Sequence, residues 1–168
     1  MSLALMMPVS AMGGDLRIES ARSAGPSSIT GGATVMGWDL SVIESGNNGW
    51  FCLPDNADTP GNSPLCGNEP WLSFLKSYMK KEKPAYTGVG ISYMLQGDWP
   101  VSNTDPYASG PTQDNQWSND SGPHLMVLVP DLASLKGIST DPNNGGPFVM
   151  WAGTDYAHIM VPIQSHPK

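Results

Sequence analysis

Basic side chains are few in this chain and unevenly placed. Lys and Arg number 8 in 168 residues, against 15 Asp and Glu, and residues 23–75 and 84–135 contain neither Lys nor Arg. Nucleic-acid grooves need clustered Lys and Arg to replace the counterions of phosphate, and anionic membrane surfaces attract the same side chains. The sequence therefore argues against nucleic acid and against anionic membranes as partners.

Long apolar runs are missing as well. A transmembrane helix needs about 20 predominantly apolar residues, and no stretch of the sequence approaches that length. Residues 3–12 form a shorter apolar run that includes Val9-Ser10-Ala11, a small-residue cleavage pattern, although no basic residue precedes it. We interpret residues 1–12 as the remnant of a signal peptide or as an N-terminal arm, and residues 13–168 as a single globular domain. No membrane insertion is expected.

Charged residues of both signs are scarce, at 14% of the chain where about 25% is usual. Gly (19) and Pro (16) are abundant instead. Coiled coils and helical bundles need periodic Glu, Lys, Ala and Leu, and charged disordered tails need a high net charge per residue. The composition therefore favours short strands, few helices and long ordered loops.

Hydrophobic periodicity and turn residues predict an α+β fold. The clearest helix follows Asn68, a candidate N-cap, and its apolar residues recur at three- and four-residue spacing until Pro84. Because helices and strands do not alternate as βαβ units, we expect a mostly antiparallel sheet with two or three short helices and long ordered loops. Helices are predicted at residues 15–22, 69–82 and 130–136, a hairpin at 33–44, and strands at 87–95, 124–129, 148–152 and 157–163.

The chain has two cysteines, Cys52 and Cys66, on either side of a segment rich in Pro, Asp and Asn. An even number of cysteines around a polar loop is typical of a disulfide formed in an oxidising compartment. The alternative is a pair of reduced thiols, and the spacing does not match a structural zinc site. We predict a disulfide between the two cysteines and a periplasmic or secreted location.

The pattern His-x-Met occurs at the start of two predicted strands, as His124 with Met126 and as His158 with Met160. Residues i and i+2 of a strand point to the same face, so each pattern presents an imidazole beside a thioether. If the two strands are neighbours in matching register, four ligands converge in a set that suits Cu(I). In ligand chemistry alone these residues resemble the His-x-Met sites of periplasmic copper-carrier proteins. Copper is therefore the one cofactor that the sequence suggests.

Core packing is the competing interpretation of the same residues. Methionine readily fills irregular gaps in cores, and a histidine at the start of a strand is commonly a structural group. Two further strand methionines, Met94 and Met150, fit either view, as substitute ligands or as core residues. The sequence does not separate the two interpretations.

An enzymatic interpretation needs a base and a nucleophile. His124 or His158, with Asp131 or Asp155 as the orienting carboxylate, would supply the base of a hydrolase. Ser92 does not lie in a Gly-x-Ser-x-Gly elbow, and no phosphate loop or dinucleotide fingerprint is present. The sequence leans away from an enzyme and assigns no catalytic residue.

The longest predicted loop, residues 96–123, carries three aromatic residues, Trp99, Tyr107 and Trp117, among Asp, Asn, Ser, Thr, Gly and Pro. Loops of this length in a compact domain are usually functional or disordered. Aromatic rings beside neutral polar side chains suit contacts with sugars and protein partners. These three residues are the candidates for binding a small ligand, a glycan or a protein.

Four longer segments carry a resemblance when they are taken together: Asn48–Asp55, Tyr93–Gly97, Ser121–His124, and Val149–Thr154 followed by Tyr156–His158. They are similar to segments of a family of uncharacterised bacterial exported proteins, over most of the chain. The resemblance implies a periplasmic or secreted location and brings no known activity. We therefore expect a non-enzymatic binding or structural module, with a copper-binding protein and a hydrolase as alternatives.

Overall fold

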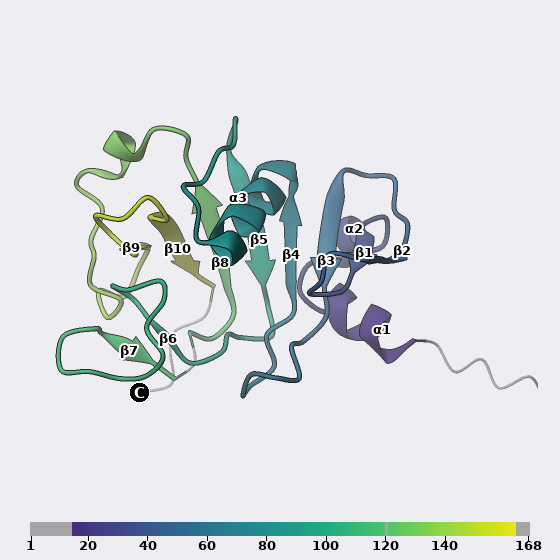
Figure 1. Cartoon of the computed structure of the whole chain (residues 1–168), viewed down its shortest axis with the longest axis horizontal. Coiled ribbons are helices and arrows are strands. Elements are labelled where there is room, and N and C mark those ends of the chain that lie inside the picture. The colour runs from purple at the N-terminus through teal and green to yellow at the C-terminus, as the bar shows by residue number, and fades with distance from the viewer. Residues whose placement is uncertain (1–14, 120, 164–168) are drawn as a thin grey trace, which may run out of the picture.

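The computed structural model describes residues 15–119 and 121–163, so residues 1–12, interpreted above as a signal-peptide remnant or arm, lie outside the described residues. A twisted sheet forms the centre of the molecule (Figure 1). The helices are α1 (Leu16–Arg22), α2 (Ser27–Thr30), α3 (Glu69–Lys80) and the 3-10 helix η1 (Leu132–Leu135). The strands are β1 (Thr34–Met36), β2 (Val42–Glu44), β3 (Trp50–Leu53), β4 (Leu65–Asn68), β5 (Gly90–Met94), β6 (Val101–Ser102), β7 (Trp117–Ser118), β8 (His124–Leu128), β9 (Phe148–Met150) and β10 (His158–Pro162).

The main sheet has eight strands in the order β2-β1-β3-β4-β5-β8-β10-β9. Of its pairs, β1–β3 is parallel and the others are antiparallel. Strand β5 lies between β4 and β8, as expected of a strand without charged residues. Strands β6 and β7 form a small second sheet. The predicted α+β fold with a mostly antiparallel sheet is confirmed.

Helix α3 lies across one face of the central strands and closes the main core (Figure 1). The helix buries Trp71, Phe74 and Leu75, which is the apolar stripe that the periodicity predicted. Alternate residues of the strands beneath it, among them Met126 and Met160, are buried in the same core. The sheet face under α3 is therefore apolar and rich in methionine.

The bounds of α3 follow from what flanks it. Asn68 occupies the N-cap position, but its amide donates to the carbonyl of Val89 and accepts from the N–H of Ile91, both at 3.0 Å, instead of capping the helix. The helix ends before the predicted Glu82 because Lys81 adopts a left-handed φ of 58°. At 12 residues α3 is short, and no helix within the described ranges is long and apolar enough to cross a membrane.

The opposite face of the sheet is covered at both of its ends. Near β1 and β3, α1 packs Ala21 against Val35 and the cysteines in a small second core. Near β9 and β10, η1 packs Leu135 against Val149 and Ala157 in a third. The sequence predicted α1, but the helix predicted at 130–136 is a single 3-10 turn, because Lys136 leaves the helical region with a ψ of 127°.

The predicted disulfide is confirmed. Cys52 in β3 and Cys66 in β4 are direct partners in the antiparallel pair, with Cα atoms 4.1 Å apart. Both residues are fully buried beneath α1. The bridge therefore joins two neighbouring strands of the main sheet, and the polar segment between the cysteines is the connection of a hairpin.

Gly67 in β4 lies where α3 and the sheet come closest. A Cβ atom at this position would lie 2.8 Å from Cδ1 of Trp71 and 2.9 Å from Cε1 of Phe51. We expect Gly67→Ala to lower the free energy of unfolding by about 1–3 kcal/mol, the range for overpacked cores. Gly110→Ala is the matched control, because its Cβ would meet no atom within 4 Å. Urea unfolding compares the two, and equal stabilities would show that the rings move aside without cost.

Candidate functional site

The strongest candidate site is a polar groove beside Trp117, which we call the Trp117 groove. Trp117 belongs to β7 and lies opposite Ser102 of β6. The volume of the groove is about 390 Å³, within the range of about 300–1,000 Å³ that small-molecule sites occupy. Besides Trp117, its walls include Asn103, Gln116, Asp141, Asn143 and Phe148. Two parts of the loop 96–123 and the segment before β9 thus meet at one site.

Asn103 is only 4% exposed and carries an unpartnered atom. Its Nδ2 donates to the carbonyl of Gln116 at 2.8 Å, and its backbone carbonyl accepts the N–H of Trp151 at 2.7 Å. Because a carbonyl can only accept, the amide nitrogen of Asn103 faces Gln116 and Oδ1 faces away from it. That oxygen is buried and accepts no hydrogen bond from the described residues. Leaving such an acceptor unpaired costs about 1–3 kcal/mol, so a hydrogen-bond donor that reached it would stabilise this part of the protein.

Gln116 holds this part of the groove in a strained conformation. Its φ of 46° lies in the left-handed region that residues other than glycine rarely adopt. Its carbonyl accepts both the side-chain Nδ2 and the backbone N–H of Asn103, at 2.8 and 3.3 Å. Strain that neighbouring contacts maintain is frequent at ligand sites. These two hydrogen bonds fix the start of β7 and with it the position of Trp117.

The Trp117 groove is polar without being positively charged. Its polar side chains are amides, hydroxyls and one carboxylate, that of Asp141, and none of the described residues lining it is Lys, Arg or His. The chain as a whole has a net charge of -7, so anionic ligands are disfavoured. Amides both donate and accept hydrogen bonds, and an indole offers a flat apolar face. This arrangement suits a neutral ligand that carries several hydroxyl groups.

The structure separates the three aromatic residues that the sequence grouped as ligand-binding candidates. Trp117 lines the groove, whereas Trp99 packs against Trp38, with ring centroids 6.1 Å apart, and joins the main core. Tyr107 stacks on Tyr78 at 5.2 Å, and its hydroxyl donates to the Tyr78 carbonyl at 3.0 Å. Of the three, Trp117 alone lies beside the polar groove.

The predicted copper ligands are brought together only in part. Strands β8 and β10 are antiparallel neighbours, and the buried positions of both place the four residues on one face of the sheet. Met126 is directly opposite Met160, but His124 is opposite Pro162. His158 is four residues before Pro162, so the two histidine backbones are roughly 13 Å apart along the strands at about 3.3 Å per residue. The antiparallel register therefore staggers the two histidines along the strands, although His124 still lowers the pKa of His158 through its charge.

His158 and Met126 instead line an internal cavity between α3 and the sheet, which we call the inner cavity. Its volume is about 50 Å³, and Met94, Asp98 and Met150 also line it. Burial lowers the pKa of His158 to about 4, although a hydrogen bond to a backbone carbonyl opposes this effect. The imidazole is therefore neutral at neutral pH.

The residues proposed for a hydrolase have other contacts. Asp131 accepts the N–H of Ala133 at 2.9 Å and caps η1, and a carboxylate oxygen of Asp155 lies 3.1 Å from the ammonium of Lys83. Nδ1 of His158, the atom that an orienting carboxylate would hold, bonds to a backbone carbonyl. Neither aspartate therefore orients His158 as a general base.

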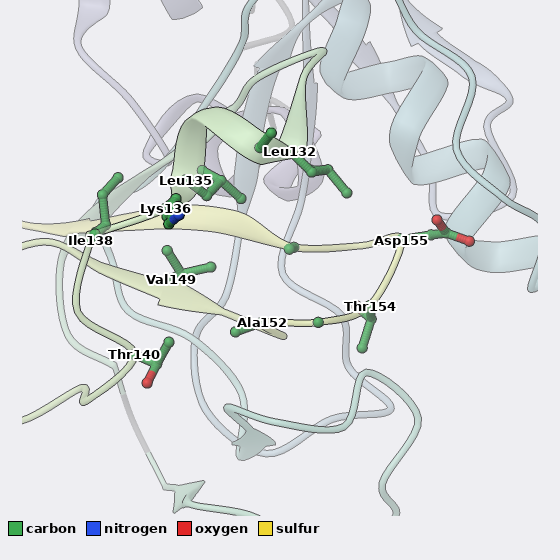
Figure 2. Close-up of a pocket in the computed structure, with 13 residues that line it drawn as sticks. Leu132, Leu135, Lys136, Ile138, Thr140, Val149, Ala152, Thr154 and Asp155 are labelled. Atoms are coloured by element: carbon green, nitrogen blue, oxygen red, sulfur yellow. The ribbon is translucent and has the colours of Figure 1, made fainter.

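A wider groove lies beneath η1, on the sheet face opposite α3 (Figure 2). Its volume is about 790 Å³, and its walls are largely apolar, with Leu135 from η1, Val149 from β9 and Ile138 from the segment between them. The hydroxyl of Thr154 donates to a backbone carbonyl, and Asp155 pairs with a lysine. This groove lacks the buried, convergent polar groups that fix the orientation of a ligand, so we favour the Trp117 groove.

Comparisons of the chain with protein-family models, with curated proteins and with solved structures found no match. The resemblance to bacterial exported proteins therefore stays a prediction. Function is inferred from the geometry of the described residues.

Sequence reasoning missed most of the Trp117 groove. It selected Trp117 but not Asn103, Gln116 or Asn143. The available signal was the density of Asn and Asp in residues 96–123 and 139–147. That density does not reveal which side chains meet, because their meeting depends on the pairing of β6 with β7 and on the return of the chain to β9.

Proposed function

We propose that the protein is a binding module that holds a neutral sugar in the Trp117 groove. The observation that carries the proposal is a groove with an aromatic wall, one of whose lining residues, Asn103, has a buried and unpartnered Oδ1. A pyranose ring has an apolar C–H face, which packs on an indole, and hydroxyl groups at its rim. One hydroxyl donates to Oδ1 of Asn103, and the ring stacks on Trp117.

The remaining polar groups of the groove support the same class of ligand. The amides of Gln116 and Asn143 can each pair with the donor and the acceptor of a hydroxyl. Asp141 accepts only, and its charge disfavours acidic sugars and phosphorylated ligands. A neutral glycan satisfies all of these groups, whereas a purely apolar ligand would leave Asn103 unpaired.

An extracytoplasmic location is part of this proposal. The Cys52–Cys66 disulfide supports it, because such bridges form and persist in oxidising compartments. The apolar run before residue 13 fits the same location. We infer a periplasmic or secreted module rather than a cytoplasmic one, and oxidised protein recovered from the periplasm or medium of the native host is the observation that checks it.

Calorimetric titration with neutral oligosaccharides, namely cello-, xylo-, manno- and chito-oligosaccharides, tests the sugar site. We expect at least one of them to bind, and Trp117→Ala to weaken that binding at least tenfold, because truncating an aromatic anchor at the centre of a site commonly costs about 1.4 kcal/mol or more. Asn143→Ala should weaken it severalfold, since one exposed amide is lost. An acidic sugar such as polygalacturonate should not bind.

Tyr107→Ala is the matched control, because it removes a partly exposed aromatic ring outside the groove. Its affinity for the sugar should equal that of the wild type. Loss of binding in Tyr107→Ala with retention in Trp117→Ala would move the site to the Tyr107 surface and contradict the proposal. Absence of binding across the whole oligosaccharide panel would contradict it as well.

A further inference from the structure

We propose that the inner cavity binds one soft monovalent cation of the Cu(I) class through His158, Met126 and Met150. This site is separate from the Trp117 groove, and the proposal does not depend on sugar binding. It also differs from the site predicted from the sequence, because His124 and Met160 do not belong to the ligand set. The argument rests on the state of one imidazole, on the register of three strands and on the size of the cavity.

The hydrogen bonding of His158 suits the imidazole to act as a metal ligand. The residue is 1% exposed, and its Nδ1 donates to the carbonyl of Tyr156 at 3.0 Å. Because that carbonyl can only accept, the proton is on Nδ1 and Nε2 carries a lone pair. Nε2 is buried and has no hydrogen-bond partner among the described residues. A backbone carbonyl that fixes the tautomer and leaves the other nitrogen available is the usual arrangement around histidines that bind metals.

The strand register places two thioethers beside this imidazole. Met150 of β9 is directly opposite His158 of β10, and directly opposite side chains have Cβ atoms about 4.5–5.5 Å apart. On the other side of β10, the register of β8 puts Leu128 opposite His158, so Met126 is the diagonal neighbour of the histidine. Diagonal neighbours lie about 7–8 Å apart, within reach of a long flexible side chain. All three residues line the inner cavity.

The ligand chemistry selects the kind of ion. One neutral imidazole and thioether sulfurs are soft ligands that suit Cu(I), whereas Mg²⁺, Ca²⁺ and Mn²⁺ prefer oxygen. No group of three or more His, Cys, Asp or Glu suitable for a metal occurs among residues 15–119 and 121–163, so a zinc site of the common type is not indicated. Asp98 also lines the cavity and supplies a negative charge near a monovalent cation. A fourth sulfur, that of Met94, lines the same wall.

The dimensions of the inner cavity agree with a single ion. A cavity of about 50 Å³ has room for one ion or for a few water molecules at most, and not for an organic ligand. Among its wall residues, Tyr78 and Trp99 are partly exposed and the others are buried. An ion would therefore enter between these two rings. Rings of Trp71, Phe74 and Trp151 surround the imidazole at centroid distances of 5.7, 6.1 and 5.0 Å and shield the site from water.

Anaerobic titration of the full chain with Cu(I), in competition with a chromogenic Cu(I) chelator, tests the proposal, with Ag(I) as an air-stable second probe. We expect one tight equivalent that Met150→Leu and Met126→Leu each weaken at least tenfold. Both substitutions conserve volume and should preserve the fold. Binding should change little between pH 6 and pH 8, because the imidazole is already neutral and releases no proton. Four further methionines at or before residue 12 lie outside the described residues and offer additional thioethers. The titration must therefore report the number of Cu(I) ions bound per chain.

Met160→Leu is the matched control, because Met160 is a buried methionine on the same strand and face as His158 but does not line the inner cavity. Its affinity for Cu(I) should equal that of the wild type. Imidazole NMR signals provide a second readout, and the chemical shift of Nε2 of His158 should change on addition of Ag(I). Equal affinity in wild type, Met126→Leu and Met150→Leu would overturn the proposal. So would a loss of affinity in Met160→Leu as large as in Met150→Leu, or an unshifted His158 signal.

Discussion

Acidification of the metal-free protein from pH 7 to pH 4 should lower its free energy of unfolding by about 3 kcal/mol through His158 alone. In the unfolded chain an imidazole has a pKa of about 6.5, whereas burial lowers the pKa of His158 to about 4 in the folded protein. The unfolded state therefore takes up the proton first. The stability that depends on the neutral imidazole is fully present above about pH 6.5 and is lost as the pH falls to about 4. The magnitude follows from about 1.36 kcal/mol for each unit of pKa difference.

Urea unfolding of wild type and His158→Leu at several pH values between 7.5 and 4, in the presence of a chelator, measures this contribution. Carboxylates titrate in both proteins, so the difference between the two stability curves reports His158 together with its charge interaction with His124. That difference should be constant above about pH 6.5 and should then fall toward pH 4, in favour of the variant. Parallel curves would show that the folded protein accepts the proton without cost, for instance through water that reaches the ring.

The elements that the sequence predicted correctly are those whose bounds are set by interactions between residues close together in the chain. Helix α1 has its Asp15 cap, whose carboxylate accepts the N–H of Arg17 at 3.0 Å, and α3 has a three- and four-residue apolar stripe. Strand β4 escaped prediction because its sequence Leu-Cys-Gly-Asn has little intrinsic preference for a strand, and it becomes one by pairing with β3 and β5. Helix α2 has only four residues between Pro26 and Gly31, too few for periodicity to appear.

The same distinction applies to the candidate sites: placement within one strand could be predicted, and pairing between strands could not. The alternation within one strand correctly placed His124 with Met126, and His158 with Met160, on one face of the sheet. Whether two such strands run in the same or in opposite directions is not encoded in that alternation. The antiparallel register brought Met126 to Met160 and staggered the histidines along the strands. The partner of His158 across β9 is Met150, a residue that the sequence offered only as a substitute.

The Trp117 groove could not be predicted from the sequence because it depends on the pairing of two strands of only two residues each. Strands β6 and β7 form one short ladder, Val101 with Ser118 and Ser102 with Trp117, and neither carries a periodic pattern. The burial of Asn103 follows from this ladder and from the hydrogen bond that its carbonyl accepts from Trp151. Both depend on contacts across distant parts of the chain. Length and composition marked the segment as a candidate for binding, and tertiary pairing determines which of its side chains meet.

Replacement of both cysteines, Cys52→Ala with Cys66→Ala, should lower the free energy of unfolding by about 3 kcal/mol. The cysteines are 14 residues apart, and the chain-entropy model assigns about 3 kcal/mol to a closed loop of about 15 residues. Both side chains are fully buried against Ala21 of α1, so lost packing adds to the effect. Urea unfolding at pH 7 measures the change. Unfolding of the wild type in urea with a reductant should approach the curve of the variant, since the unfolded chain is then free of the bridge.

The double cysteine variant should lose stability but keep the proposed sugar site intact. The disulfide joins β3 and β4, and β5, β8 and β10 separate these strands from β9, whose Phe148 lines the Trp117 groove. Affinity for the oligosaccharide, measured well below the unfolding midpoint, should therefore equal that of the wild type. Unchanged stability of the double variant would contradict the role of the bridge. Lower affinity at full folding would show that the two ends of the sheet are coupled through its strands.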